Sequence, residues 1–204
     1  MDAARVAALR ELLGSTGWVE RTHLFARTMR TATRTPGGLL LVGTPDEEPW
    51  HLAAHLDDES RWTGVVEIRP TLVRWHVPEG APPHLSVTLQ RLEDAGRGET
   101  VLVVAEEDAP DPLLERAWDA RKHGATVLSL DGGDAQLAEV AHESLTVTRA
   151  DLVVPELSFD SVQHLVSVAT GEVAAGAGET ASRRGLRTRL AQVLDTISGT
   201  APRA

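Results

Sequence analysis

The sequence has 204 residues, 42% of them hydrophobic and 25% charged, which suits one globular domain with a buried core. It contains no cysteine, which excludes disulfides, thiolate metal ligands and thiol catalysis. The net charge of −10 and the aromatic content of 3% argue against nucleic-acid binding, since the surface would repel a polyanion and offers few side chains for base stacking. We expect neither a signal peptide nor contact with a membrane, because no stretch approaches about 18 consecutive apolar residues, and we therefore expect a cytoplasmic protein.

The chain begins with two segments in which apolar residues recur at helical spacing, and these predict helices over residues 2–13 and 18–33. The polar side of the second helix carries four arginines, which we interpret as a solvated face: Arg21, Arg27, Arg30 and Arg34. The pattern then changes to a short apolar run over residues 39–42, between two glycines. Such a run is typical of a strand that is buried on both faces of a sheet.

Strands and helices alternate along the rest of the chain. Further strands are predicted at 65–68, 72–77, 100–105, 126–130 and 144–147, the second of them as an edge strand. Helices are predicted at 49–59, 83–95, 110–123, 134–142 and 155–173. This alternation predicts an α/β fold with a doubly wound, mainly parallel, five-stranded sheet in flavodoxin-like order. The strand at 39–42 should lie inside it, beside the strand at 100–105.

The domain organisation follows from a change in composition near the C-terminus. We expect one α/β domain over residues 1–173, with the N-terminal helices in residues 1–34. Residues 174–182 are rich in alanine and glycine and predict a flexible linker. Residues 183–204 predict an amphipathic helix followed by a disordered tail.

Three segments resemble the sugar isomerase (SIS) domain, and within that family the phosphoheptose isomerases. They are residues 98–132, a strand, loop, helix and strand; residues 37–56, a first strand, loop and helix; and residues 154–168, a closing helix. The similarity covers roughly residues 18–173 and lies in the pattern of elements more than in identical residues. It implies a SIS-type fold with N-terminal helices and a long C-terminal helix.

The phosphate-binding loops of the family are altered in this chain. SIS sugar-phosphate sites carry a loop of the form Ser-Thr-Ser-Gly-Asn-Ser after the third strand, and here Glu106, Glu107 and Asp108 occupy that loop. The first loop, residues 43–48, is also acidic and contains Thr44. A carboxylate about 5 Å from a phosphate repels it by roughly 3 kcal/mol per charge at an effective dielectric constant near 20. We interpret these acids mainly as helix caps; the alternative is that Thr44, Glu106, Glu107 and Asp108 bind a cationic or metal-carrying ligand.

Histidines four residues apart indicate a second candidate site. His51 and His55 lie on one side of a predicted helix, at a spacing that can hold a transition metal. The resemblance implies a zinc site here, with His51, His55, Glu156 and His164 as ligands, and an alternative alignment places Asp160 beside His164. The other reading is a pair of surface histidines without a metal. Zinc is the one cofactor that these residues suggest.

The resemblance also implies aldose–ketose isomerisation, with the acid and base roles falling to His55 and His164. Because the hydroxyl-rich phosphate-binding loop of the family is missing, we favour a non-catalytic SIS-like protein that binds a small ligand, a metal or a protein partner. A sugar-phosphate isomerase or epimerase is the alternative. We expect a homodimer or homotetramer built on the N-terminal helices and the closing helix.

Overall fold

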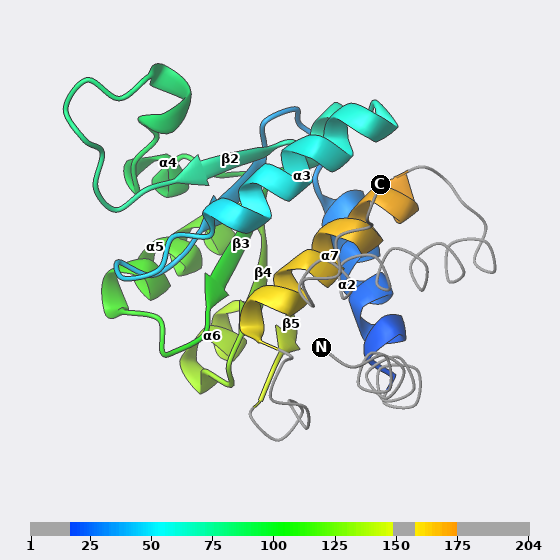
Figure 1. Cartoon of the computed structure of the whole chain (residues 1–204). Helices are drawn as coiled ribbons and strands as arrows, with labels where there is room; N and C mark the ends of the chain where they lie inside the picture. Colours follow the sequence, from blue (N-terminus) through cyan, green and yellow to red (C-terminus); the bar gives the residue numbers. More distant parts are fainter. Residues whose placement is uncertain (1–16, 149–157, 175–204) are drawn as a thin grey trace.

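The computed structural model describes residues 17–148 and 158–174 (Figure 1). Element labels follow Figure 1, so the first helix described is α2. The strands are β1 (Leu39–Val42), β2 (Pro70–Val73), β3 (Thr100–Ala105), β4 (Thr126–Asp131) and β5 (Glu143–Thr146). The α-helices are α2 (Trp18–Ala32), α3 (Trp50–Thr63), α4 (Gln90–Glu93), α5 (Asp111–Lys122), α6 (Ala135–Val140) and α7 (Phe159–Ala174). Two short 3₁₀ helices are η1 (Val66–Ile68) and η2 (Pro83–Leu85).

The five strands form one sheet in the order β2-β1-β3-β4-β5, and every neighbouring pair is parallel. Leu39 in β1 pairs with Pro70 on one side and with Thr100 on the other. The prediction of a doubly wound sheet with β1 inside and β3 beside it is therefore confirmed. In such a sheet the loops at the carboxyl ends of the strands form the usual place for a ligand.

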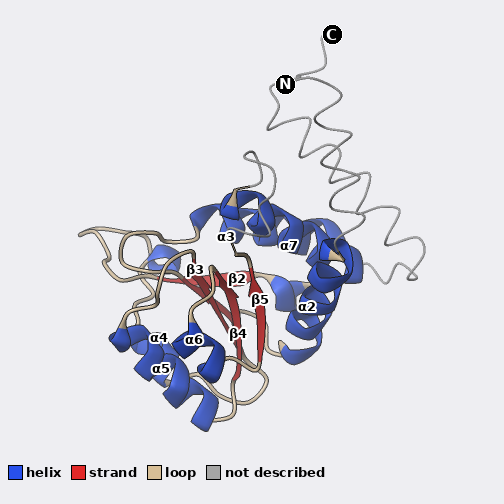
Figure 2. Ribbon diagram, turned by 90° about the horizontal axis from the view of Figure 1, so that it is seen from below, coloured by secondary structure: helices blue, strands red, loops and turns tan. Residues whose placement is uncertain are grey.

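Helices cover both faces of the sheet (Figure 2). Successive side chains of a strand point to opposite faces, and β1 shows this clearly. Leu39 and Leu41 belong to the core under α2, α3 and α7, whereas Leu40 and Val42 belong to the core under α4, α5 and α6. This is why residues 39–42 read as an unbroken apolar run in the sequence, and why both β1 and β3 have the bounds that the sequence predicted.

The strand predicted at residues 65–68 is wrong. Helix α3 continues to Thr63 and ends at Gly64, whose φ of 71° is left-handed, and the chain then forms the 3₁₀ turn η1. Only Ile68 of this turn is fully buried, while Val66 is exposed. The edge strand is β2, which begins two residues before the predicted 72–77 and starts with Pro70, a residue tolerated at the first position of an edge strand.

The helix predicted at residues 83–95 is also wrong, because this segment is divided into η2 and the single turn α4. The residues between them pair with the chain that follows β2. The N–H of Arg74 donates to the carbonyl of Val87 at 2.8 Å, and Arg74 forms a parallel bridge with Thr88. This extended pairing cannot coexist with a continuous helix.

Several predictions lie outside the described residues. They are the helix at 2–13, the start of the closing helix with Glu156, the linker at 174–182 beyond its first residue, and the amphipathic segment at 183–204.

Gly43 shapes the loop between β1 and α3. The N–H of Thr44 donates to the carbonyl of Glu47 at 3.1 Å, which folds the loop back on itself. A Cβ atom at position 43 would lie 2.1 Å from that carbonyl oxygen and 2.7 Å from Cδ of Pro49. Both distances are far below van der Waals contact, so this turn requires glycine.

We expect Gly43→Ala to reduce the free energy of unfolding by about 2 kcal/mol or more, because the added methyl group meets backbone rather than a flexible side chain. Urea denaturation measures the effect. Gly96→Ala is the matched control, since its Cβ would meet only the carbonyl oxygen of His123, at an ordinary 3.8 Å. Equal stability of the two variants would contradict the prediction.

Candidate functional site

Three histidines from two helices converge beside the carboxyl edge of the sheet. His51 and His55 come from the first half of α3, and His164 comes from α7, which packs beside α3 (Figure 1). The ring centroids lie 4.8 Å apart for His51–His55, 4.3 Å for His51–His164 and 4.1 Å for His55–His164. One nitrogen atom from each ring can be chosen so that all three lie within 4.8 Å of one another.

The pattern of buried residues explains this convergence. Leu52 and Leu56 turn one side of α3 into the core, and on α7 Val162 and Val166 do the same. The histidines occupy the adjacent sides of the two helices, where α3 and α7 face each other. The i, i+4 spacing on α3 then presents two rings to the single ring on α7.

The histidines affect one another's protonation. Burial, together with the nearby His55 and His51, lowers the pKa of His164 to about 4, although Asp160 acts in the opposite direction. Burial and then His51 also lower the pKa of His55, opposed by Asp58. His55 and His164 are therefore neutral at pH 7, which is the form of imidazole that binds metals.

Asp160 is the carboxylate that approaches the histidines. Its Oδ2 lies 3.8 Å from Nδ1 of His51, and its Oδ1 accepts a hydrogen bond from Nε2 of Gln163 at 3.2 Å. Both His51 and Asp160 are largely exposed, so their attraction is weak. Of the four residues expected as metal ligands, the structure brings together His51, His55 and His164, and Glu156 lies outside the described residues.

The acidic loops line a cavity of about 210 Å³ at the carboxyl ends of β1 and β3. Burial, then Glu106, Asp160 and Glu107, raise the pKa of Glu47. Asp160 therefore lies close enough to influence both this cavity and the histidines. The cavity lining includes all four residues that the sequence suggested for ligand binding, namely Thr44, Glu106, Glu107 and Asp108. The other lining residues are Pro45, Asp46, Glu47 and Pro110.

The interpretation of these acids as helix caps is wrong. The N-cap residues of α3 and α5 are Pro49 and Pro110, and neither helix has a side-chain hydrogen bond at its N-cap. A side-chain cap does occur on α6. Oδ1 of Asp134 accepts from the N–H groups of Gln136 and Leu137, at 2.8 and 3.1 Å.

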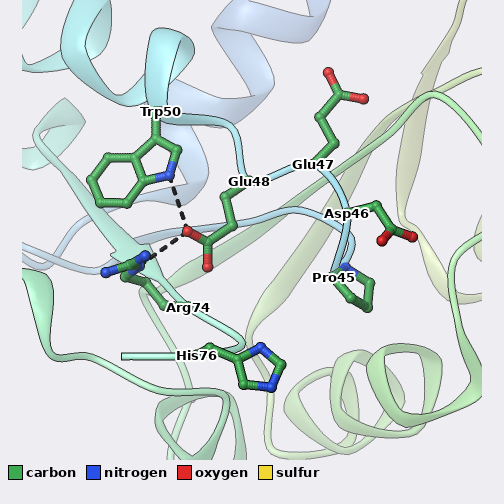
Figure 3. Close-up of a pocket in the computed structure, with 7 residues that line it drawn as sticks. All are labelled: Pro45, Asp46, Glu47, Glu48, Trp50, Arg74 and His76. Carbon is green, nitrogen blue, oxygen red and sulfur yellow. Dashed lines mark hydrogen bonds and ion pairs between the residues drawn. The ribbon is translucent and has the colours of Figure 1, made fainter. Parts of the chain in front are cut away.

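A second pocket, of about 440 Å³, opens between the loops that follow β1 and β2 (Figure 3). Its walls include Glu48, Trp50, Arg74 and His76. No pattern in the sequence indicated this group of residues. Glu48 and Arg74 are 26 positions apart, and their meeting depends on the pairing of β1 with β2.

The comparisons with known proteins bear on the fold. No protein-family model matches the sequence, and no curated protein matches it. Solved structures do match, and two of them each have a TM-score of 0.56 to this chain. One is described as a "putative sugar binding protein" from Salmonella typhimurium LT2, at 15% identity over 94% of this chain and 53% of that one. The other is a "putative phosphosugar isomerase" from Silicibacter pomeroyi DSS-3, at 16% identity over 96% of this chain and 55% of that one.

At these identities the comparisons show the fold alone. The chain has the α/β fold of phosphosugar isomerase-like structures and spans about half the length of each of the two. Among the described helices, none combines the length and the apolar character needed to cross a bilayer.

The lowered pKa of His164 predicts a loss of stability in acid. The unfolded chain takes up this proton near pH 6.5 and the folded chain only near pH 4, so stability falls as pH decreases between these values. We expect metal-free protein to lose more of its free energy of unfolding between pH 7 and 5 than a His164→Asn variant does. Urea denaturation in the presence of a chelator measures this, with His123→Asn, which removes an exposed histidine, as the control. Identical pH profiles for the parent and His164→Asn would contradict the prediction.

Proposed function

We propose that this chain is a metal-dependent binding protein with a SIS-like fold, and that zinc is the metal that suits it best. The observation that carries this proposal is the convergence of His51, His55 and His164, with their nitrogen atoms within 4.8 Å of one another. Three neutral imidazoles are a common donor set for zinc, and they leave a fourth position open for a ligand or water.

The histidines fit the metal in chemistry and nearly fit it in distance. Zinc–nitrogen bonds of about 2.0–2.1 Å place tetrahedral ligands roughly 3.3 Å apart. The widest pair would have to close by about 1.5 Å, which rotation of exposed or half-buried imidazoles can supply. Oδ2 of Asp160 lies 3.8 Å from Nδ1 of His51, just beyond hydrogen-bond distance, so a small rotation of either exposed side chain would let it accept a hydrogen bond from that ring and orient it.

The acidic loops support binding rather than sugar-phosphate chemistry. Glu106, Glu107 and Asp108 are exposed at the cavity, and the pKa of Glu47 is already raised, first by burial and then by its acidic neighbours. A phosphate dianion placed there would add to this repulsion. The ligand that binds beside the histidines is therefore neutral or cationic in this proposal. The chain has lost the phosphate-binding loops that an isomerase of this fold would use to hold its substrate.

A sugar-phosphate isomerase of the phosphoheptose isomerase type is the second candidate. The observation that favours it is the contact between His55 and His164, whose ring centroids are 4.1 Å apart and whose pKa values are both lowered. Two neutral imidazoles side by side could exchange a proton with a substrate. Turnover of a sugar phosphate that is lost in both His55→Ala and His164→Ala would favour this candidate over binding alone.

We also propose that the chain works in the cytoplasm as a homodimer or homotetramer. Exposed large apolar side chains support assembly, because a subunit interface would remove them from solvent. They are Leu24 on α2, which is one of the expected interface helices, and Trp62 on α3 and Val66 in η1, which lie next to those helices.

The metal site is tested by removing two of its ligands. We expect the parent protein to bind about one zinc ion per chain, with a melting temperature that falls on chelation because the metal stabilises the folded state. The double variant His51→Ala/His55→Ala should bind no zinc, and its melting temperature should not change on chelation. Elemental analysis and thermal unfolding give the two readouts.

The control for this experiment removes the same number of imidazoles from elsewhere on the surface. In His84→Ala/His123→Ala both substituted residues are exposed, and this variant should keep the zinc content of the parent. Parent protein that neither carries zinc nor responds to added zinc would contradict the proposed function.

The proposed loss of phosphate binding is tested by measuring the affinity for heptose and hexose phosphates by calorimetry. We expect no measurable binding to the parent. The change Glu106→Ser/Glu107→Ser should raise anion affinity, because it removes two negative charges that face the cavity and restores hydroxyl donors. Tight binding to the parent, or no gain in the variant, would count against the repulsion argument.

A further inference from the structure

The first turn of α3, which carries His51, has the buried Leu52 as its core anchor but no side-chain cap. The residue before the helix is Pro49, which makes no side-chain capping bond. The backbone of this turn is held by the N–H of Trp50, which donates to Glu48 O at 2.8 Å, and by the N–H of Ala53, which donates to Pro49 O at 3.0 Å. Helix ends of this kind fray unless side chains anchor them.

The positions of His55 and His164 are held more firmly than that of His51, because buried residues flank them. His55 lies one turn further along α3, flanked by the fully buried Leu52 and Leu56, and His164 lies in α7 beside the buried Leu165. The side chain of His51 is half exposed, at 51%, and so is that of its neighbour Asp160, at 58%. His51 is therefore the histidine of the cluster whose position depends most on a support outside the cluster.

Such a support is present on the other side of the first turn (Figure 3). Oε2 of Glu48 accepts hydrogen bonds from Nε1 of Trp50 and from Nε of Arg74, each at 3.0 Å. Oε1 of the same carboxylate accepts from the N–H of Trp75 at 3.2 Å. The guanidinium of Arg74 also stacks on the indole of Trp50, with Cζ 4.6 Å from the ring centroid.

The ion pair between Glu48 and Arg74 is shielded from solvent and tied to the sheet, whereas the indole of Trp50 that rests on it is 41% exposed. The side chains of Arg74 and Glu48 are only 14% and 13% exposed, so their attraction is stronger than that of a surface ion pair. Arg74 and Trp75 directly follow β2, which is paired with β1. Nε1 of Trp75 donates to the carbonyl of Gly43 at 2.8 Å, which fixes the start of the same loop. Through Glu48 and Arg74, the indole of Trp50 is thus held against the chain that follows β2.

We propose that Glu48 and Arg74 are positioning residues for the metal site: by clamping Trp50 they hold the adjacent His51 against His55 and His164. This inference rests on the proposed zinc site. The pair touches neither the metal nor the ligand, and it acts through the first turn of α3. Outer residues that orient metal ligands commonly affect metal affinity by roughly 10- to 100-fold, so the contribution is measurable.

The test replaces both members of the pair, in Glu48→Gln/Arg74→Met, so that neither charge is left buried alone. We expect zinc affinity, measured by competition with a chromophoric chelator, to fall by about tenfold or more. The visible absorption of the cobalt-substituted protein should also change, since it reports the arrangement of the nitrogen ligands.

The matched control is a second shielded ion pair, far from the histidines. Arg91 and Glu99 form an ion pair with side-chain exposures of 30% and 13%, and Glu99 lies beside the amino end of β3. The variant Glu99→Gln/Arg91→Met should lower the melting temperature yet leave zinc affinity and the cobalt spectrum as in the parent. A purely structural role for Glu48 and Arg74 would make the two variants alike in zinc affinity, and that result would overturn the inference.

A measurement without metal separates this inference from the proposed function. In chelator-treated parent protein we expect nuclear Overhauser contacts between the ring protons of His51 and His164, whose centroids are 4.3 Å apart. These contacts should be lost in Glu48→Gln/Arg74→Met and kept in the control variant. If they persist in the former, the positioning role is wrong whether or not zinc binds. If the parent binds no zinc but the contacts follow the prediction, the proposed function alone fails.

Discussion

The packing of α7 against α3 is the contact on which the candidate site depends. The two helices are far apart in the chain, with α3 ending at Thr63 and α7 beginning at Phe159, and both cover the same face of the sheet (Figure 2). Their close approach is aided by Gly171 on α7, where a Cβ atom would lie 1.8 Å from Oε2 of the buried Glu59 on α3. Near their other ends, the same approach leaves room for three imidazole rings in mutual contact. Without this contact, His51 and His55 would be two histidines on a helix surface.

The acidic loops work against the general preference of this sheet edge for anions. The helices that follow β1 and β3 direct the positive ends of their dipoles toward the loops, and such positions commonly bind phosphate. Here the loops fill the region with their own carboxylates instead. The raised pKa of Glu47 shows that burial and crowding of these acids already oppose further negative charge. This excess of negative charge is the feature on which the proposed loss of phosphate binding rests.

The sequence predicted the parts of the fold that local pattern determines. Strands β1 and β3 are buried on both faces, so their apolar runs gave the correct bounds. The segment at 83–95 failed because helical spacing of apolar residues cannot reveal that Val87 and Thr88 pair with the chain after β2. The strand predicted at 65–68 failed because three β-branched residues, Val65, Val66 and Ile68, resemble a strand, although only Ile68 is fully buried.

Like the fold, the candidate site was predicted only in part from the sequence. The spacing of His51 and His55 is a local feature, and the place of His164 followed from the resemblance of the closing helix. The clamp of Glu48, Trp50 and Arg74 was missed because its members meet only through the pairing of β1 and β2, and no short-range pattern marks it. The capping interpretation failed for a related reason. Prolines at the N-caps of α3 and α5 leave the neighbouring acids without a capping role, so these acids point to the cavity.

The histidines and the acids form one electrostatic unit, and this determines what the edge of the sheet can bind. Asp160 opposes the fall in the pKa of His164 and contributes to the rise in the pKa of Glu47, so it acts on both groups. A divalent ion held by neutral imidazoles would place two positive charges beside these carboxylates and favour their ionised forms. By thermodynamic reciprocity, ionised carboxylates would in turn strengthen the binding of the ion. The proposed metal site and the proposed loss of phosphate binding are therefore consistent with each other, because both favour a ligand that carries positive charge or none.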